Sequence, residues 1–533
     1  NVLLKRPALY SIDDWNFENN NFWKKKLFDK KKVDEHYFNL MGGNKKVKDL
    51  NHYYRYSEIN FDMDNKKITD VFNDLRKEAI VEHLNISKHK IKFVEHYLCH
   101  HYHAFYSSPY RNENVLIAHL EGDGGRYNNA ISTVSKKGLK VISGSKSADI
   151  GRLYQWTTLL LGMKPYHDEY KVMGLAPYAT EKEVFKSYQI FKDVFKLSNN
   201  KLNITYKNKP RDLYFTFQEK LQGHRFDGIA GALQKTLEKV TIDWLSNAQK
   251  KLNKKILCYG GGVAMNVKAN GLFQDYTNFN KIFVPLSPSD ESNAIGACYY
   301  STEKHFLKNG KDIFLIKPLS TPYLGPNIIS KNLNKFLNET KKSRGKIKFF
   351  ENFSNDLVAN YLKKGKVIGR ASGRSEFGQR ALGNRSILAN PSYSGIVQKI
   401  NSAIKYRDFW MPFCPTIMSK FEKDVIINKK NVLSKYMTSS FKLKDEYKKK
   451  AFGASHTADN TVRPQILSSE DNEDYFKLIQ KFYHKTNIPM LINTSLNLHR
   501  EPMASDMEDC FKILKKTHLD GMIINNNLIV IED

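Results

Sequence analysis

The sequence of 533 residues predicts an α/β protein. VLIAHLEGDGG (115–125) reads as a buried strand that runs into a glycine-rich turn. KKILCYGGGVAMNVKANGLF (254–273) reads as a strand, a glycine loop and a helix. KIFVPLSPSDESNAIGACYY (281–300) repeats this form, with a polar turn and a helix that begins near Asp290. Recurring strand–turn–helix units are typical of α/β layers.

A change in composition near 317–345 predicts a domain boundary. KPLSTPYLGPN is rich in turn residues and KKSRGK is a charged run, and a second α/β region begins at KIKFFENF. We therefore expect two domains, residues 1–340 and 341–533, which agrees with roughly 100–200 residues or more per domain.

The composition excludes several classes of protein. Hydrophobic residues make up 41% and aromatic residues 12%, which excludes wholesale disorder. No apolar run approaches the roughly 20 residues of a membrane helix, and the first twenty residues lack an apolar signal core. The five cysteines are scattered, odd in number and without a CxxC pair. We therefore expect the protein to act in a reducing cytoplasm, which could also be the cytoplasm of a phage-infected cell.

The formal net charge of +30 follows from 85 Lys+Arg and 55 Asp+Glu. A large positive charge attracts phosphate polymers. The alternative is codon drift, since a chain rich in Lys and Asn is common in AT-rich genomes. Basic and aromatic residues alternate near the N-terminus, as a strand- or base-binding surface requires, although an amphipathic helix flank explains them equally well. They are Trp15, Phe17, Phe22, Trp23, Lys24, Lys25, Lys26, Lys30, Lys31, Lys32 and residues 53–56.

Arginine is concentrated in the second half of the chain. Seven of the arginines lie between 370 and 500: Arg370, Arg374, Arg380, Arg385, Arg407, Arg463 and Arg500. Arginine is preferred over lysine where a planar fork holds a phosphate or carboxylate. This region is therefore the first candidate for a phosphate-handling site, above all the glycine- and arginine-rich run 373–386.

Two histidines lie four residues apart in EHYLCHHYHAF. This spacing places His96 and His100 on one helix face, where both can bind one metal ion, while His101 and His103 point elsewhere. Carboxylates follow two predicted strands, Glu121 and Asp123 after one and Asp290 after another. Two histidines with carboxylates suit Fe(II), Mn or Zn. The alternative is that Glu121 and Asp123 only shape a turn.

Three further polar segments are weaker signals. Gly260–Gly262, between a strand and a helix, can bring backbone amides to a phosphate or can be a tight turn. Glu169 and Lys171 stand before a glycine and a proline, which indicates little beyond a loop. The segments 405–407 and 493–497 are polar clusters beside apolar strands, and each is equally compatible with a capped turn.

Taken together, these segments resemble the O-carbamoyltransferase family typified by nodulation-factor and aminoglycoside carbamoyltransferases. The matching pieces run in family order from about 96 to 505. They are HYLCHHYHAFY, GRLYQWTTLLLGM, EYKVMGLAPY, GGGVAMNVKANG, DESNAIGA, GRSEFGQRALGNRSILANP, NSAIKYRDFWMPF, DNTVRPQ and NTSLNLHREPM.

The resemblance implies an actin-like (ASKHA) first domain, similar to the universal tRNA threonylcarbamoyladenosine synthase subunit, and a YrdC-like second domain. It implies that carbamoyl phosphate and ATP with Mg give a carbamoyl adenylate in the second domain. The first domain then transfers the carbamoyl group to an acceptor hydroxyl. A metal can polarise the carbonyl as a Lewis acid, and the hydroxyl needs a general base.

The resemblance also implies roles for individual residues. The metal ligands, for Fe(II) or another divalent ion, are His96, His100, Asp290 and either Glu121 or Asp123. The catalytic residues are Lys405, Arg407, Arg374 and Arg380, of which Lys405 and Arg407 match the Lys-x-Arg hallmark of the YrdC fold. Nucleotide and co-substrate binding falls to Gly261, Gly262, Asn266, Glu169, Lys171, Arg385, Arg463, and to Ser495 and Asn497, which match its Ser-x-Asn.

The chain departs from the family pattern in four places. Glu121 and Asp123 stand at a turn where one Asp is usual, which leaves the metal-binding carboxylate open. Gln379 replaces the usual proline, and Met411 stands where an arginine is common. The opening strand with the His-Asp pair that carries the candidate base is not recognisable at the N-terminus.

The acceptor stays open. The charge and the aromatic-basic N-terminus favour a nucleic-acid hydroxyl, such as a hydroxymethylated pyrimidine in DNA, over a small glycoside or natural product. Another class on the same fold is a metallopeptidase or sugar kinase, but no Glu lies between His96 and His100. A non-catalytic nucleic-acid-binding protein leaves Lys-x-Arg and Ser-x-Asn unexplained. No membrane partner is expected, and a homodimer is left open.

Overall fold

The computed structural model describes residues 65–111, 113–329, 333–405, 407–499 and 501–532, with six isolated positions before residue 30. The chain divides into two compact units. Unit 1 comprises residues 1–95, 155–167 and 210–222, and unit 2 comprises residues 96–154, 168–209 and 223–533. Most of the aromatic-basic N-terminal segment lies outside the described residues, so its predicted role stays a prediction.

Among the described residues, two helices lie in unit 1, and a third begins in unit 2 and ends in unit 1. They are α3 (Asn65–Leu84), α8 (Phe215–Lys220) and α5 (Ile150–Leu160), with the short 3-10 turn η4 (Lys88–Lys90) after α3. Within unit 1, the buried Leu159 packs with the partly buried Ile12, Trp156 and Tyr214. No described helix is both long enough and apolar enough to cross a membrane.

The first sheet of unit 2 has five strands in the order β3-β2-β1-β6-β7. Its strands are β1 (Val115–Leu120), β2 (Asn129–Ser135), β3 (Gly138–Ser145), β6 (Ile256–Gly260) and β7 (Lys281–Phe283). β1, β2 and β3 are antiparallel, while β1, β6 and β7 are parallel. Every residue of β1 is buried, which explains its nearly continuous apolar sequence.

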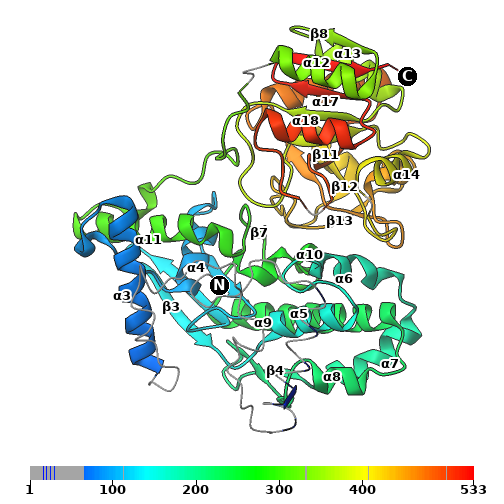
Figure 1. Ribbon diagram of the computed structural model, residues 1–533. Coiled ribbons are helices and arrows are strands. Elements are labelled where there is room, and N and C mark those ends of the chain that lie inside the picture. The colour runs from blue at the N-terminus through cyan, green and yellow to red at the C-terminus, as the bar shows by residue number, and fades with distance from the viewer. Residues whose placement is uncertain are drawn as a thin grey trace. The chain divides into compact units, whose positions relative to one another are not determined.

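Helices surround this sheet (Figure 1). They are α4 (His96–Tyr106), α6 (Glu169–Leu175), α7 (Glu181–Phe191), α9 (Phe226–Leu252), α10 (Val267–Tyr276) and α11 (Asn293–Lys308). Short 3-10 turns are η5 (Ala176–Tyr178), η6 (Gly262–Met265), η7 (Asp290–Ser292) and η8 (Ile313–Leu315), and β4 (Phe195–Leu197) pairs with β5 (Ile204–Tyr206). The predicted strand at 115–125 is confirmed as β1, and the two strand–turn–helix predictions are confirmed by β6 with η6 and α10 and by β7 with η7 and α11.

The second sheet of unit 2 has eight strands, all from residue 347 onward, in the order β15-β11-β16-β10-β9-β17-β18-β8. The strands are β8 (Ile347–Phe350), β9 (Ile368–Ala371), β10 (Arg385–Ala389), β11 (Cys414–Met418), β15 (Gln465–Leu467), β16 (Met490–Ser495), β17 (Gly521–Ile524) and β18 (Asn527–Ile531). The predicted mixed α/β class is thus confirmed in both regions.

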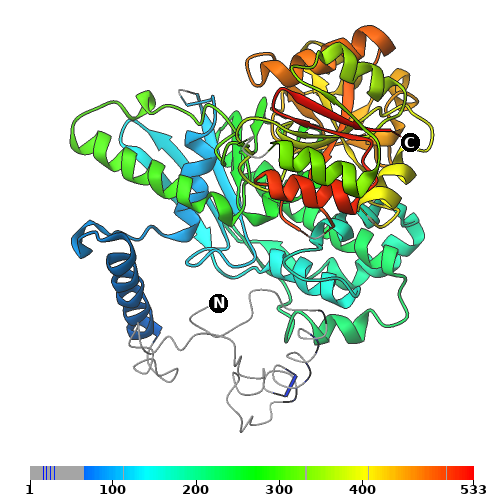
Figure 2. The same cartoon turned by 45° about the horizontal axis from the view of Figure 1, so that its top comes forward.

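The helices of this second region pack in pairs. The main ones are α12 (Leu333–Arg344), α13 (Asn355–Lys363), α14 (Ile396–Ile400), α17 (Glu473–Thr486) and α18 (Met507–Lys516). α12 and α18 lie side by side against the second sheet (Figure 2). Their apolar side chains belong to the same core cluster as Ile387 and Ala389 of β10. α12 therefore belongs with the second sheet, although it begins before residue 341.

Smaller elements complete the region. They are η9 (Asn401–Lys405, a π-helix), η10 (Ser419–Phe421), α15 (Glu422–Val425), α16 (Asp445–Lys448) and η11 (Phe452–Ala454), with the small sheet of β12 (Ile426–Ile427), β13 (Phe441–Leu443) and β14 (Thr461–Val462).

The close approach of α4 and α11 generates a test of this packing. A Cβ on Gly296 of α11 would lie 2.0 Å from the carbonyl oxygen of Cys99 in α4. We expect Gly296→Ala to push the helices apart and to lower the free energy of unfolding by about 1–3 kcal/mol, measured by denaturant titration. Ala294→Ser, at an exposed position of the same helix, should change it by no more than about 0.5 kcal/mol. Equal stability of both variants would contradict the close packing.

Candidate active site

Four side chains from three places in the chain converge near the end of β1. His96 and His100 come from α4, Glu121 follows β1, and Asp290 begins η7. Their nearest nitrogen and oxygen atoms all lie within 4.8 Å of one another. The Nε2 atoms of His96 and His100 are 3.0 Å apart. Asp290 Oδ1 lies 3.2 Å from His96 Nε2, and Glu121 Oε1 lies 3.1 Å from His100 Nε2.

The backbone around Glu121 holds this carboxylate in place. Its Oε1 accepts a short hydrogen bond from the Gly262 N–H, at the turn after β6. Gly261 has a φ of +92°, and a Cβ there would lie 2.5 Å from the carbonyl oxygen of Leu120. Only glycine fits this position without strain. The glycine turn therefore fixes the position of the Glu121 carboxylate, in addition to any role in binding a nucleotide.

The electrostatics of the cluster favour a positive charge at its centre. Burial lowers the pKa of His100, but hydrogen bonds to Asp290 and Glu121 outweigh burial and raise this pKa to about 9. Hydrogen bonds from His100 and then His96 hold the pKa of Asp290 well below its usual range. Burial raises the pKa of Glu121, but the hydrogen bond from His100 prevails, so the pKa is lowered. A divalent cation can supply the positive charge that a proton on His100 otherwise provides.

The donor set fits a divalent metal ion. Two imidazole nitrogens and two carboxylates form a mixed nitrogen and oxygen site, as Fe(II), Mn or Zn accept. Asn293 Oδ1 is buried and has no hydrogen-bond partner among the described residues, while Asn293 Nδ2 lies 3.4 Å from His96 Nδ1. Turning this amide gives the His96 Nδ1–H an acceptor and leaves Nε2 free for a metal.

Asp123 lies outside this cluster. Its carboxylate faces solvent and cations, with Oδ2 3.5 Å from Arg152 Nη2 and Oδ1 3.9 Å from Lys146 Nζ. Of the two carboxylates that the sequence left open, the structure therefore brings only Glu121 to the histidines.

A second centre forms around Lys405, which is buried at the end of η9. Its Nζ donates to the backbone carbonyl and Oγ of Ser495 and to the backbone carbonyl and Oδ1 of Asn497. Ser495 Oγ also donates to Asn497 Oδ1 at 2.7 Å. Burial, and then the nearby charge of Arg407, lower the pKa of Lys405. Lys-x-Arg and Ser-x-Asn are thus one contiguous group at the end of β16.

Three guanidinium groups surround the Cys414 thiol beside this lysine. Arg463 directs Nε and Nη2 at Cys414 Sγ, at 3.2 and 2.9 Å. Burial is the main cause that lowers the pKa values of Arg380 and Arg407, and the charge of Arg463 lowers both further. Within the described residues, none of the three arginines forms an ion pair with a carboxylate. This cationic cluster (Arg380, Arg407, Arg463) thus has no carboxylate at ion-pair distance among the described residues, although the charge of Glu291 acts on Arg380 from farther away.

Arg374 and Arg385 are bound differently. Arg385 is fully buried and donates to the backbone carbonyls of Ala504, Ser372, Gly373, Asn384 and Pro326. Arg374 donates to the backbone carbonyls of Leu324 and Gly325. Both guanidiniums bind loop backbone, and their predicted roles toward substrates stay predictions.

The other predicted nucleotide-binding residues also have partners. Asn266 caps α10 by accepting from the Ala269 N–H at 3.0 Å and exchanges hydrogen bonds with Gln234. Lys171 Nζ lies 3.0 Å from Asp408 Oδ2, and Trp410 Nε1 donates to the Lys171 carbonyl. Glu169 begins α6.

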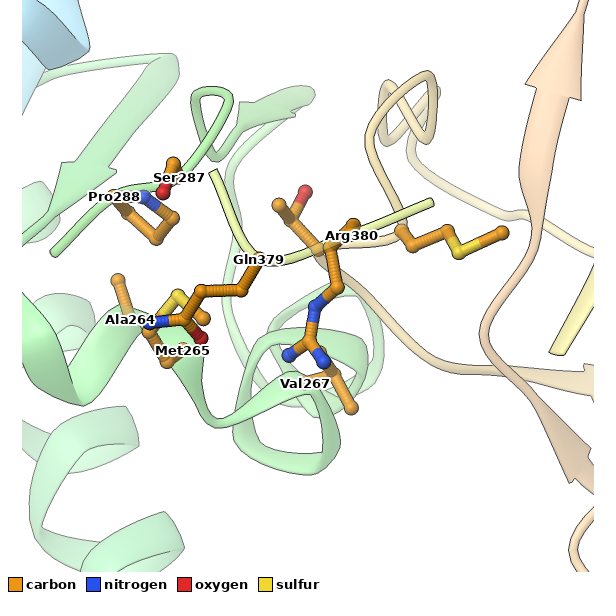
Figure 3. A pocket seen from close by; sticks show the side chains of 9 residues that line it. Ala264, Met265, Val267, Ser287, Pro288, Gln379 and Arg380 are labelled. Atoms are coloured by element: carbon orange, nitrogen blue, oxygen red, sulfur yellow. The ribbon is translucent and has the colours of Figure 1, made fainter. Parts of the chain in front are cut away.

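A small open pocket lies between the residues that follow the glycine turn and the segment that carries Arg380. It is lined by Ala264, Met265, Val267, Ser287, Pro288, Gln379, Arg380, Met437 and Thr438. Figure 3 shows Gln379 and Arg380 reaching into it from one loop segment, opposite the residues that follow the glycine turn.

The sequence had not indicated Cys414, Asp408 or Ser287. Asp408 follows Arg407 directly, and Cys414 lies three residues after Met411. This proximity in the sequence was the signal that could have indicated both residues. Ser287 has a φ of +48°, which no sequence pattern revealed.

Comparison with known proteins identifies two matching family models. The model described as carbamoyltransferase N-terminus matches residues 28–299, and the one described as carbamoyltransferase C-terminus matches residues 359–530. Together they cover both centres.

Several curated relatives match most of the chain. An uncharacterized protein of Methanocaldococcus jannaschii is 30% identical over 87% of this chain and 78% of its own length. The nodulation protein NolNO of Sinorhizobium fredii is 29% identical over 83% of this chain and 64% of its own length. The nodulation protein NolO of Bradyrhizobium diazoefficiens is 27% identical over 82% of this chain and 78% of its own length. A crystal structure of full-length HypF, in the phosphate- and nucleotide-bound form, covers 35% of this chain and 23% of its own at 17% identity, but the TM-score of 0.23 is too low to bear on the fold.

The metal-ligand geometry predicts which variants lose metal. We expect His100→Ala to weaken binding of Mn(II) or Zn(II) at least about 10-fold, because it removes a buried donor, and we expect Asp123→Asn to bind as the wild type does. Competition with a chromophoric chelator measures both affinities, and the melting temperature in EDTA controls for folding. Equal losses in both variants would contradict the assignment of the site.

Proposed function

Because the chain belongs to the carbamoyltransferase family, we propose that it is an ATP-dependent O-carbamoyltransferase. Carbamoyl phosphate, water and ATP yield carbamoyl adenylate, phosphate and pyrophosphate. An acceptor hydroxyl then attacks the carbonyl carbon, its proton passes to a base, and AMP leaves. The product carries the carbamoyl group on the acceptor oxygen.

The observation that carries the proposal is the cationic cluster beside Lys405. Three guanidiniums without a carboxylate partner in the described residues are costly to hold together, unless an anion joins them. Phosphoryl oxygens are the anions that such forks bind best, and adenylate formation needs cations along a triphosphate. Lys405 is oriented by four oxygen acceptors from Ser495 and Asn497.

The transfer step belongs to the first centre. A divalent ion held by His96, His100, Glu121 and Asp290 would supply a Lewis acid for the carbonyl. The small pocket supports this division, because one wall comes from the residues that follow the glycine turn behind Glu121 and another from the segment of Arg380.

Removal of one unpaired cation tests the activation step. We expect Arg380→Met to lower carbamoyl phosphate-dependent release of pyrophosphate from ATP by about 100-fold, because a donor to the phosphoryl oxygens is lost. Its melting temperature should not fall, since Arg380 forms no ion pair within the described residues. Lys442→Met, an exposed cation on β13, is the matched control. Unchanged release in Arg380→Met, or none in the wild type, would refute the proposed step.

The acceptor is tested separately. The net charge of +30 favours a nucleic-acid hydroxyl, with a small glycoside or natural product as the second candidate. If DNA is the acceptor, retention of DNA containing hydroxymethylated pyrimidines should weaken steeply with salt. Mass spectrometry should then find bases heavier by one HNCO unit. A product only on a hydroxylated small molecule, with DNA retention insensitive to salt, would assign the second candidate.

A further inference from the structure

Two polar side chains line the small pocket without a partner of their own. Within the described residues, neither the Gln379 carboxamide nor the Arg380 guanidinium takes part in a hydrogen bond or an ion pair. In Figure 3 the Gln379 amide extends toward Ala264 and Met265, and the Arg380 guanidinium extends toward Val267. Adjacent residues thus present a neutral amide and a cation to the same space.

The opposite wall offers few free polar groups. Ser287 Oγ donates a short hydrogen bond to Glu291 Oε1, and Thr438 Oγ1 donates to the Val284 carbonyl at 3.2 Å. The Pro288 carbonyl accepts the Gly261 N–H at 2.9 Å. The remaining lining is apolar, from Ala264, Met265, Val267 and Met437. A polar ligand group in the pocket must therefore find its partners mainly at Gln379 and Arg380.

The segment that carries these two residues is tightly fixed. Gly378 has a φ of +89°, and a Cβ there would lie 2.6 Å from Ser287 Cβ. The Phe377 N–H donates to the Pro322 carbonyl at 2.8 Å. This anchoring limits how far the amide of Gln379 can move from the pocket.

We propose that Gln379 is a specificity-determining residue that recognises the carbamoyl group while Arg380 binds the phosphoryl group attached to it. The inference rests on the proposed function and deepens it. A carbamoyl group is a primary amide-like unit with one N–H₂ donor and one C=O acceptor, and the carboxamide of Gln379 offers the complementary acceptor and donor. In carbamoyl phosphate and carbamoyl adenylate the phosphoryl group is bonded to the carbamoyl oxygen. Neighbouring groups on the ligand thus meet neighbouring residues in the chain.

The test compares carbamoyl phosphate with acetyl phosphate, in which a methyl group replaces the amine. The methyl group cannot donate to the Gln379 carbonyl, so the wild type should prefer carbamoyl phosphate. In Gln379→Leu we expect KM for carbamoyl phosphate in pyrophosphate release to rise about 10-fold or more, with little change in KM for acetyl phosphate. Gln379→Glu should weaken both substrates, because the new carboxylate pairs with Arg380.

Gln398→Leu is the matched control, since Gln398 is an exposed glutamine on α14 outside the pocket. Equal melting temperatures of the variants exclude unfolding as the cause. Wild-type activity with carbamoyl phosphate and unchanged discrimination in Gln379→Leu would overturn the inference and leave the proposed function intact. Absence of carbamoyl phosphate-dependent activity in the wild type would instead overturn the proposed function itself.

Discussion

The hydrogen bond from the Gly262 N–H to the Glu121 carboxylate is the contact on which the arrangement of the site depends. It joins the end of β1 to the turn after β6, which are neighbouring parallel strands. On one side of this bond lie His96, His100 and Asp290, and on the other begins η6, which lines the small pocket. A carboxylate so fixed can bind a metal without losing side-chain freedom at that moment.

The second centre differs from the first, because its cations are held together without the hydrogen-bond acceptors that would stabilise them in the folded chain. Arg385 shows how this chain stabilises a buried guanidinium, with five backbone carbonyls around it. Arg380, Arg407 and Arg463 have no such set in the described residues and repel one another around one thiol. Like charges held together at a cost, next to residues that are fully satisfied, are typical of functional sites, which is why the proposed function places the phosphate there.

Local patterns in the sequence predicted the strands, the glycine turn and the helix that carries His96 and His100, because these depend on neighbours in the chain. The choice between Glu121 and Asp123 was beyond such patterns, since it depends on the distant Gly262 and Arg152. Arginine density indicated a phosphate site but did not separate Arg385, which binds loop carbonyls, from Arg380. The difference between Arg385 and Arg380 arises only in the folded chain, where the loops that carry Pro326 and Ala504 meet at the Arg385 guanidinium.

Two of the four departures from the family pattern, Gln379 and Met411, lie in the region of the second centre. Met411 is buried, and its Sδ would lie 2.8 Å from a Cβ on Gly174 of α6. Methionine fills this space without charge. Gln379, in place of proline, keeps a backbone N–H and adds an amide at the pocket. Both residues are neutral. Under the proposed function, the three arginines set the preference for a phosphate, and discrimination between uncharged groups on that phosphate falls to neutral residues such as Gln379.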